Sequence, residues 1–401
     1  MPQHDPAPAP PITRDPRDPS SSLQAALRNY HTLDVRFTGN GGEYFRIWIV
    51  SSLLTALTLG LYWPWAKARR LRYFWSHTLV GGEPLAYHGN PRQMFKGQAL
   101  IGVLFLLYSV AGQFSVLGGV VALLAVAGLW PALFRSGMVF KLGNTSWRGL
   151  RLHFCGGLPE AYRAVLPFLL PLLGLVLLGT LAPQDAPPQD ELGPWEWGAL
   201  GLLGLVVVLA PAQWWSLKAY QHRHYMLGGL RTGFRATARE FYGLALRFLL
   251  MLLAGGALIA GVIVLLTPWL AAGGHPVLAM VLGVALPLAG GLAVFSAIWP
   301  WWQVRMQNLV WTETGSAQLR FISRLRLWPY LLLQWRNALL TALTLGLYRP
   351  FAAVATARMR LQSVQIRSRV DLEGLLVVAR ASPQEAAGEA AGDAFGVDLG
   401  L

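Results

Sequence analysis

The sequence is poor in charge and nearly devoid of cysteine. Only 13% of its 401 residues are Asp, Glu, Lys or Arg, whereas about a quarter is usual for soluble domains. The single cysteine, Cys155, excludes a disulfide within the chain. Hydrophobic residues make up 54% and gather in uninterrupted blocks rather than amphipathic stripes. These proportions predict a polytopic integral membrane protein.

The sequence also lacks the short motifs of common catalytic and nucleotide-binding sites. It has no Walker loop, HExxH pair, GxSxG turn or dinucleotide glycine pattern after a strand. We therefore predict no enzyme activity and no cofactor. His222 and His224 are a weak candidate for a metal pair, because no cysteine or carboxylate stands near them in the sequence. A basic juxtamembrane segment is the simpler interpretation.

Acidic residues are scarce relative to basic ones, which leaves a formal net charge of +14. A nucleic-acid-binding protein would collect such charge on a polar face. Here the cations lie between apolar blocks, so we predict contact with anionic lipid head groups and no nucleic-acid partner. The positive-inside rule places four basic segments in the cytoplasm, namely 66–96, 135–163, 218–247 and 303–326. It places the acidic loop 183–196 outside.

Six apolar blocks are long enough to cross a bilayer, which takes about 20 helical residues. They are 97–113, 116–134, 164–182, 197–217, 244–266 and 277–299. Two further blocks, 47–63 and 330–348, are shorter or carry polar residues. Each of these two stands alone between basic segments, so it either crosses the bilayer or enters and returns. Around this repeat-built membrane domain (31–380) we predict two disordered tails, 1–30 and 381–401.

The two shorter blocks contain a nearly literal repeat. Residues 53–64 (LLTALTLGLYWP) recur as residues 339–350 (LLTALTLGLYRP), with eleven of twelve positions identical. We expect both segments to adopt one backbone and to face each other across the helices, either as packing surfaces or as broken helices that line a site. The retained polar and special residues are candidate functional positions: Thr55, Gly60, Tyr62, Thr341, Gly346 and Tyr348.

The second repeat is a frame that begins with an aromatic residue. A small residue follows two positions later, Glu or Gln six positions later, and a second aromatic residue eight positions later. The frame starts at Phe37, Tyr87, Phe154 and Phe234, and a degenerate copy starts at Phe321. Asn, Gly or Thr precedes each acid by three residues, which predicts capped helix starts at Glu43, Glu160 and Glu240. Short β-like stretches before the frames predict small cytoplasmic hairpins.

The same charged positions allow functional interpretations. The three glutamates either carry protons or bind a cation at the membrane edge, or they cap helices and pair with a local cation such as Arg46 or Arg163. Arg336 is costly inside an apolar block. It either snorkels, pairs with one of the glutamates, or binds an anionic group.

Residues 43–50 (EYFRIWIV), 53–62 and 65–69 (WAKAR) resemble the YjgN-like family of bacterial inner-membrane proteins. That family has an F-x-G-x-G-x-E-x-F-[KR] entry followed by a T-L-G-[IL]-Y core, and the resemblance extends from Val35 to Ala379. Ala353 and Ala355 stand where the first copy has Lys67 and Arg69, so a shared role for those cations does not carry over. The resemblance implies an inner-membrane location and supplies no activity.

The combined expectation is an all-α polytopic membrane protein with small hairpins. Its first candidate function is that of a small-solute transporter or channel, suggested by repeats and polar-interrupted segments. The alternative is a non-catalytic membrane scaffold or envelope-interaction protein. Small residues such as Gly198, Gly201 and Gly204 favour close helix packing, and a homo-oligomer is a further candidate assembly.

Overall fold

Glycine turns and capping residues separate short strands from long apolar helices along the chain. The structure is a computed structural model in which residues 31–182, 193–369 and 377 are described. The predicted tails, 1–30 and 381–401, lie outside the described residues.

One order of elements occurs five times: a strand, a helix, a second helix and a strand. Unit one is β1 (His31–Phe37), α2 (Gly41–Leu57), α3 (Trp63–Ser76) and β2 (Thr78–Val80). Unit two is β3 (Glu83–Tyr87), α4 (Pro91–Phe114), α5 (Val116–Gly143) and β4 (Thr145–Trp147). Unit three is β5 (Leu150–Phe154), α6 (Leu158–Leu181), α7 (Pro194–Arg223) and β6 (Tyr225–Leu227).

Unit five has the same order of elements as units one to three, whereas unit four has an extra strand. Unit four begins with two short strands and is β7 (Leu230–Arg231), β8 (Gly233–Phe234), α8 (Ala238–Ala272), α9 (Pro276–Thr312) and β9 (Thr314–Gly315). Unit five is β10 (Leu319–Ser323), α10 (Leu327–Leu343), α11 (Arg349–Gln362) and β11 (Val364–Ser368).

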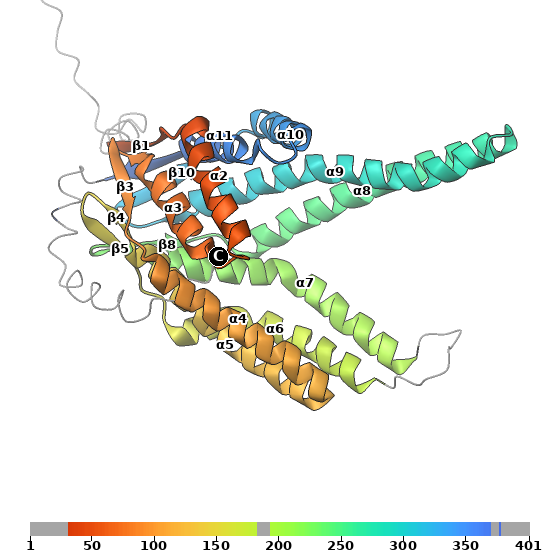
Figure 1. Cartoon of the computed structure of the whole chain (residues 1–401), viewed down its shortest axis with the longest axis horizontal. Coiled ribbons are helices and arrows are strands. Elements are labelled where there is room, and N and C mark those ends of the chain that lie inside the picture. Colours follow the sequence, from red (N-terminus) through yellow and green to blue (C-terminus); the bar gives the residue numbers. More distant parts are fainter. Residues whose placement is uncertain (1–30, 183–192, 370–376, 378–401) are drawn as a thin grey trace, which may run out of the picture.

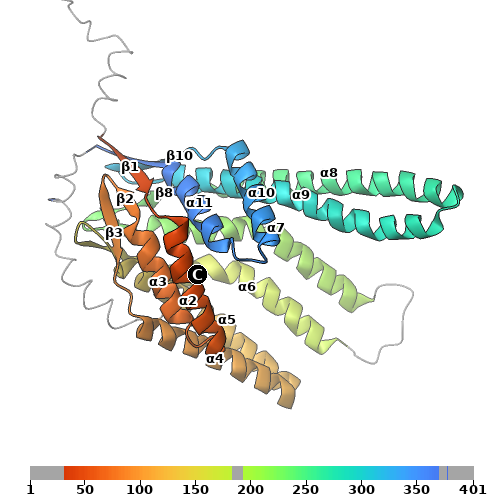
Figure 2. The ribbon, with the colours of Figure 1, turned by 45° about the horizontal axis from the view of Figure 1, so that its top comes forward.

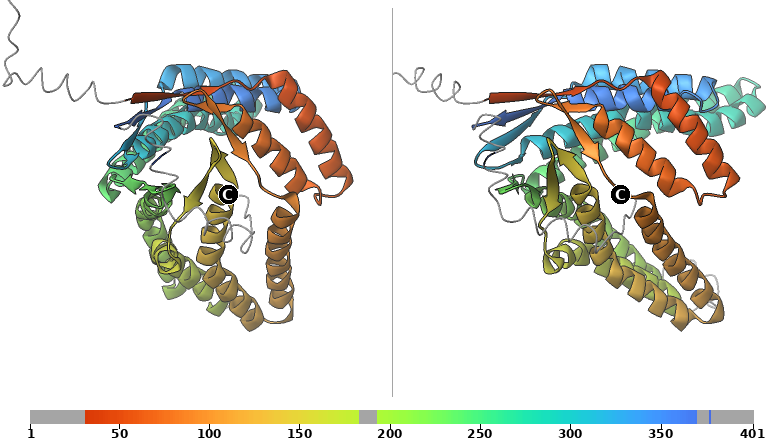
Figure 3. Two further views of the ribbon diagram at one scale, coloured as in Figure 1. Left: turned by 90° about the vertical axis from the view of Figure 1, so that its left-hand side faces the viewer. Right: turned by 60° about the vertical axis from the view of Figure 1, so that its left-hand side comes forward.

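The strands form one antiparallel sheet in the order β7-β6-β5-β4-β3-β2-β1-β11-β10-β9-β8. The strands nearest the two chain ends pair with each other, with Leu33 opposite Ile366. The two outer strands, β7 and β8, are consecutive in the chain and separated only by Thr232. The sheet is therefore a nearly closed barrel, seen at the left of Figure 1 and end-on in Figure 3.

This barrel corrects the prediction of separate small hairpins. Each predicted hairpin is present as a pair of neighbouring strands, for example Leu79 opposite Pro84 and Trp147 opposite Leu150. An isolated two-stranded hairpin is only marginally stable in water, and its edges expose unpaired backbone groups. Pairing between the hairpins, such as Tyr87 of β3 with Thr145 of β4, satisfies those edges. Local sequence patterns cannot report this pairing, because helices α4 and α5 separate its two strands in the chain.

The six predicted spans are confirmed as helices long and apolar enough to cross a membrane: α4, α5, α6, α7, α8 and α9. They form three hairpins that leave the same side of the sheet and diverge (Figures 1 and 2). At about 1.5 Å per residue, the 37 residues of α9 extend about 55 Å, well beyond a hydrocarbon core of about 30 Å. Between 0 and 17% of each apolar window is buried within the chain, so these surfaces require another apolar environment.

The core lies where the helices meet the sheet. Its fully buried side chains include Phe140, Phe241 and Tyr330, each at the sheet-proximal part of its helix. In unit one, Phe37 of β1 packs with Tyr44 and Tyr73 of the two helices. The units are thus joined by strands and by clusters at the bases of the hairpins.

The two ambiguous blocks each belong to a short hairpin. After α2 the chain turns at residues 58–62, and α3 returns to β2 of the same sheet. After α10 it turns at residues 344–348, and α11 returns to β11. Each block therefore has a returning partner helix of 14 residues that hydropathy alone does not detect.

Candidate functional site

The repeated TLGLY segments form the tips of the two short hairpins. In unit one, Leu59 and Gly60 have φ angles of 49° and 93°. In unit five, Leu345 and Gly346 have φ angles of 48° and 94°. The expectation of one shared backbone is correct at these turns. Glycine accepts this left-handed region freely, whereas leucine does so at a cost.

Threonine hydroxyls complete the hydrogen bonding of both turns. The Thr58 hydroxyl donates to the Leu54 carbonyl at 2.7 Å and accepts from the Tyr62 N–H at 3.0 Å. Thr344 makes the corresponding bonds to Leu340 and Tyr348, at 2.6 and 3.0 Å. These bonds explain why threonine recurs at this position.

The preceding threonines, Thr55 and Thr341, serve the turn through their backbones. Each carbonyl accepts the N–H of the following glycine, Gly60 or Gly346, at 2.7 Å. The Thr55 hydroxyl donates back to the Ser51 carbonyl at 2.7 Å. Neither threonine lines either of the two pockets at the short hairpins. The interpretation of the segments as walls of a polar site therefore receives no support from these hydroxyls.

The tips are apolar and open. Leu59 and Leu345 each expose 95% of their surface, and the flanking Leu57, Leu61 and Leu343 are also exposed. Tyr62 and Tyr348 stack on the aromatic residue three positions later, Trp65 or Phe351. The guanidinium of Arg69 lies 5.7 Å from the Tyr62 ring centroid, within cation–π range.

The two hairpins are neighbours, which corrects the expectation that they face each other across the bundle. Strand β1 pairs with β11, and α2 packs against α11. The rings of Phe45 and Phe351 are 5.7 Å apart at this contact. Figure 3 shows the α2/α3 hairpin beside the α10/α11 hairpin. Closure of the sheet between the two chain ends makes the first and last units adjacent.

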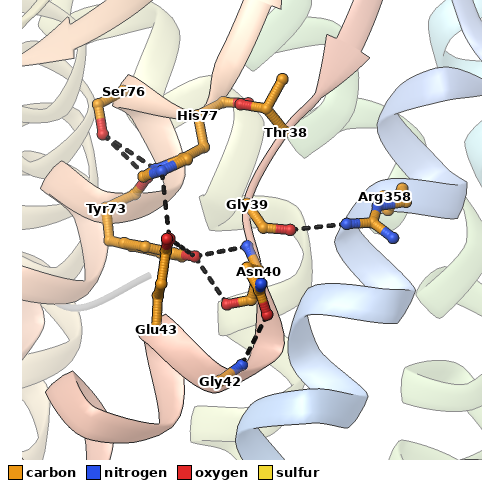
Figure 4. A network of polar contacts seen from close by, with 9 residues as sticks. All are labelled: Thr38, Gly39, Asn40, Gly42, Glu43, Tyr73, Ser76, His77 and Arg358. Carbon is orange, nitrogen blue, oxygen red and sulfur yellow. Dashed lines mark hydrogen bonds and ion pairs between the residues drawn. The ribbon is translucent and has the colours of Figure 1, made fainter.

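Glu43 lies in the first turn of α2 but does not complete the predicted capping box with Asn40. The Asn40 side chain accepts from the Gly42 N–H at 2.9 Å. The Tyr73 hydroxyl of α3 accepts the Asn40 N–H at 2.7 Å and lies 3.3 Å from Oε2 of Glu43 (Figure 4). Nε2 of His77 is 3.8 Å from the same carboxylate oxygen. A tyrosine from the returning helix has taken the acceptor role expected of the glutamate.

Glu160 and Glu240 do cap their helices. Oε2 of Glu160 accepts from the Gly157 N–H at 3.1 Å, and Oε2 of Glu240 accepts from the Thr237 N–H at 2.9 Å. Glu160 also lies 2.9 Å from Nε2 of His224. The expected local partner, Arg163, is not the one used. The three glutamates lie in different units, so the structure does not gather them into one carboxylate site.

His222 and His224 are buried rather than part of an exposed basic segment. His222 lies against Thr314, with Nδ1 2.9 Å from the threonine Oγ1. His224 turns to the carbonyl of Tyr220 and to Glu160. The two rings have different partners, and no group of three or more potential ligands that could hold a metal occurs among the described residues.

The frame glycines bind the units together, a role that sequence reasoning missed. A Cβ on Gly39 would lie 2.6 Å from the Phe37 ring, which explains the aromatic-x-glycine spacing. The Gly39 carbonyl accepts from Arg358 at 2.7 Å (Figure 4). Corresponding carbonyls in units two, three and four accept from the preceding unit's returning helix: Arg72 to Gly89, Arg135 to Gly156 and Trp215 to Ala236.

Arg46 and Arg336 line two open pockets at the bases of the short hairpins. Among the described residues, neither side chain has a carboxylate partner. Arg336 therefore does not pair with any of the three glutamates. Tyr73 also lines the first of these pockets, and burial raises the pKa of its hydroxyl.

Comparisons with known proteins place these features in a family without an assigned activity. The model of a family described as bacterial protein of unknown function (DUF898) matches residues 32–394. The inner membrane protein YjgN of Salmonella typhimurium (strain LT2) is 28% identical over 158 residues, 38% of each chain. The protein of that name from Escherichia coli (strain K12) is 30% identical over 148 residues, 36% of each chain.

The matched segment thus spans less than two fifths of the length of these curated relatives. No solved structure matches the chain.

Proposed function

This chain belongs to the DUF898 family of bacterial proteins of unknown function, and we propose that it is a non-catalytic scaffold of the bacterial inner membrane. Its strand barrel stands at the cytoplasmic surface and three long hairpins cross the bilayer. Two short hairpins enter the cytoplasmic leaflet and return. The relatives are named inner membrane proteins, and six helices are able to span a membrane.

The exposed leucines of the two tips carry this proposal. Each turn presents leucine to its surroundings while its backbone N–H groups bond within the hairpin, as Gly60 does to Thr55 and Tyr62 does to Thr58. Backbone in hydrocarbon must be satisfied internally, because no water is available there. A turn with these two properties suits a lipid environment better than water.

The dimensions support entry without crossing. Helix α2 has 17 residues and extends about 25 Å at about 1.5 Å per residue, which is shorter than a hydrocarbon core of about 30 Å. It starts at the sheet, outside the hydrocarbon core of the bilayer. Its partner α3 carries Lys67, Arg69, Arg70 and Arg72, and such cations favour the anionic head groups of the cytoplasmic leaflet. Anionic lipids are therefore the partner that we propose.

Spin-label depth measurements test the proposal. In a Cys155→Ser background, nitroxides at Leu59→Cys and Leu345→Cys are expected to contact dissolved oxygen and to be protected from a water-soluble nickel chelate. The matched control is Arg36→Cys, an exposed strand position, where the nickel chelate is expected to have full access. Nickel accessibility at the tips equal to that at Arg36 would contradict insertion.

Transport of a small anionic solute is a second candidate function, favoured by the open pocket beside Arg336. Purified protein in liposomes distinguishes the two. The scaffold proposal expects efflux of trapped phosphate and other small anions no faster than from protein-free liposomes. Saturable efflux that requires Arg336 would favour transport instead.

A further inference from the structure

Two pockets of about 640 and 450 Å³ occupy the same place in units one and five. The nearly literal repeat aligns residue n of unit one with residue n + 286 of unit five. With this offset, six lining residues of the first pocket coincide with six of the second: Ile47 with Leu333, Val50 with Arg336, Arg69 with Ala355, Arg72 with Arg358, Tyr73 with Met359 and Ser76 with Gln362. The pocket is therefore a property of the short-hairpin unit.

Most of the arginines around these pockets are not shared between the two units. Only Arg72 and Arg358 coincide, and both donate to a frame glycine carbonyl, which is a structural role. The unit-five pocket adds Arg324, Arg326 and Arg336, where unit one has Thr38, Asn40 and Val50. Because unit one forms the same hairpin without these three arginines, folding of the unit does not explain them.

The unit-five pocket has cationic and apolar walls and no acidic one. No carboxylate lines it, and within the described part of the chain the side chains of Arg324, Arg326 and Arg336 have no hydrogen-bond or ion-pair partner. Leu325, Pro329, Leu333, Ala355 and Met359 form its apolar surface. Like charges brought together repel one another unless an anion offsets them.

We propose that the pocket lined by Arg324, Arg326, Arg336 and Arg358 binds a phosphate group. The planar guanidinium fork matches phosphate oxygens in a bidentate manner, and several such contacts suit the charge of a phosphate better than that of a single carboxylate. The apolar walls beside the cations accommodate the adjoining part of an amphiphile. Phosphate-bearing lipid head groups and free phosphate are the two sources of this chemistry.

Binding to the full-length protein in a neutral detergent tests the site. Dihexanoyl phosphatidic acid, dihexanoyl phosphatidylcholine and inorganic phosphate are titrated separately, and the unfolding midpoint is followed because a ligand of the native state raises it. Phosphatidic acid is expected to raise the midpoint of the wild type more than phosphatidylcholine does. Inorganic phosphate distinguishes the sources, since an equal affinity would identify the phosphate alone as the ligand.

The decisive variant is Arg324→Gln/Arg326→Gln/Arg336→Gln, which is expected to weaken binding at least about tenfold. The matched control also removes three positive charges, but at exposed positions outside the pocket: Arg305→Gln/Arg320→Gln/Arg349→Gln. It is expected to retain the wild-type affinity. Unliganded unfolding midpoints near that of the wild type establish that both variants fold. A conservative triple Arg→Lys variant, which keeps the charge but not the fork, is expected to bind with intermediate affinity.

Equal weakening in the control would overturn the site, because it would reduce the effect to net charge. The site would also be overturned if the wild type bound phosphatidic acid and inorganic phosphate no more strongly than phosphatidylcholine. The depth of the hairpin tips does not enter this test, so its result is separate from that of the scaffold proposal.

Discussion

Nε2 of His224, the C-cap residue of α7, lies 2.9 Å from Oε2 of Glu160 in the first turn of α6. The carboxylate is partly exposed, whereas the histidine side chain is 7% exposed. Unit one repeats the arrangement more loosely, with His77 3.8 Å from Glu43. In both units the histidine follows a tyrosine by four residues and lies 2.7 Å from that tyrosine's carbonyl. The pair fastens the two ends of one long hairpin.

Glu160→Gln is therefore expected to lower stability by about 1 kcal/mol, because a glutamine keeps an acceptor for the Gly157 N–H but loses the charge opposite His224. Glu240→Gln is the control, since Glu240 caps Thr237 and its carboxylate has no ion-pair partner among the described residues. Unfolding midpoints in detergent measure both. Equal shifts would show that the histidine contact adds nothing.

Thr58→Val is expected to destabilise the first tip, because valine keeps the shape but removes the acceptor of the Tyr62 N–H. An unsatisfied amide away from water costs about 1–3 kcal/mol. Thr55→Val is the comparison, since that hydroxyl only donates to the Ser51 carbonyl, which is already part of the helix. In lipid nanodiscs, the free energy of unfolding of Thr58→Val should be lower than that of Thr55→Val. The reverse order would contradict the role assigned to the Thr58 hydroxyl.

Gly60→Ala and Gly346→Ala test backbone strain at the tips. The φ angles of 93° and 94° are unfavourable for alanine, while a Cβ would meet nothing within 4 Å at Gly60. A loss of about 1–2 kcal/mol is expected at each position. Gly102→Ala in α4 also has open space for a Cβ and is expected to be neutral or mildly stabilising. A harmless change at Gly60 would argue against the left-handed turn.

Cys155 reports the orientation of the barrel because it is exposed and immediately follows β5. A membrane-impermeant maleimide is expected to label it in inverted vesicles and not in intact cells. Partial burial raises the pKa of this thiol, so labelling is expected to be slower than for a fully solvated cysteine at the same pH. Gln189→Cys in a Cys155→Ser background, in the loop predicted to be outside, should give the opposite pattern. Labelling of Cys155 in intact cells would reverse the proposed topology.

The membrane spans and the local caps could be predicted from the sequence because each depends on residues that are close together in the chain. The six spans follow from apolar length alone, and Glu240 caps Thr237 three residues away. The tip at Leu59 and Gly60 is also local, since its hydrogen bonds join residues within five positions. These features recur wherever the same short sequence recurs, which is why the two tips match.

Contacts between distant segments were decided by the tertiary structure. Asp34 lies opposite Gln365 only because β1 and β11 close the sheet between the chain ends. The partner of Asn40 became Tyr73, on the returning helix, and that helix is too short and too charged for a hydropathy criterion to detect. The arginines at positions 324, 326, 336 and 358 line one pocket because α10 and α11 fold back on each other. Apolar length and turn chemistry are local properties of the sequence, whereas strand pairing and the grouping of like charges depend on which units become neighbours.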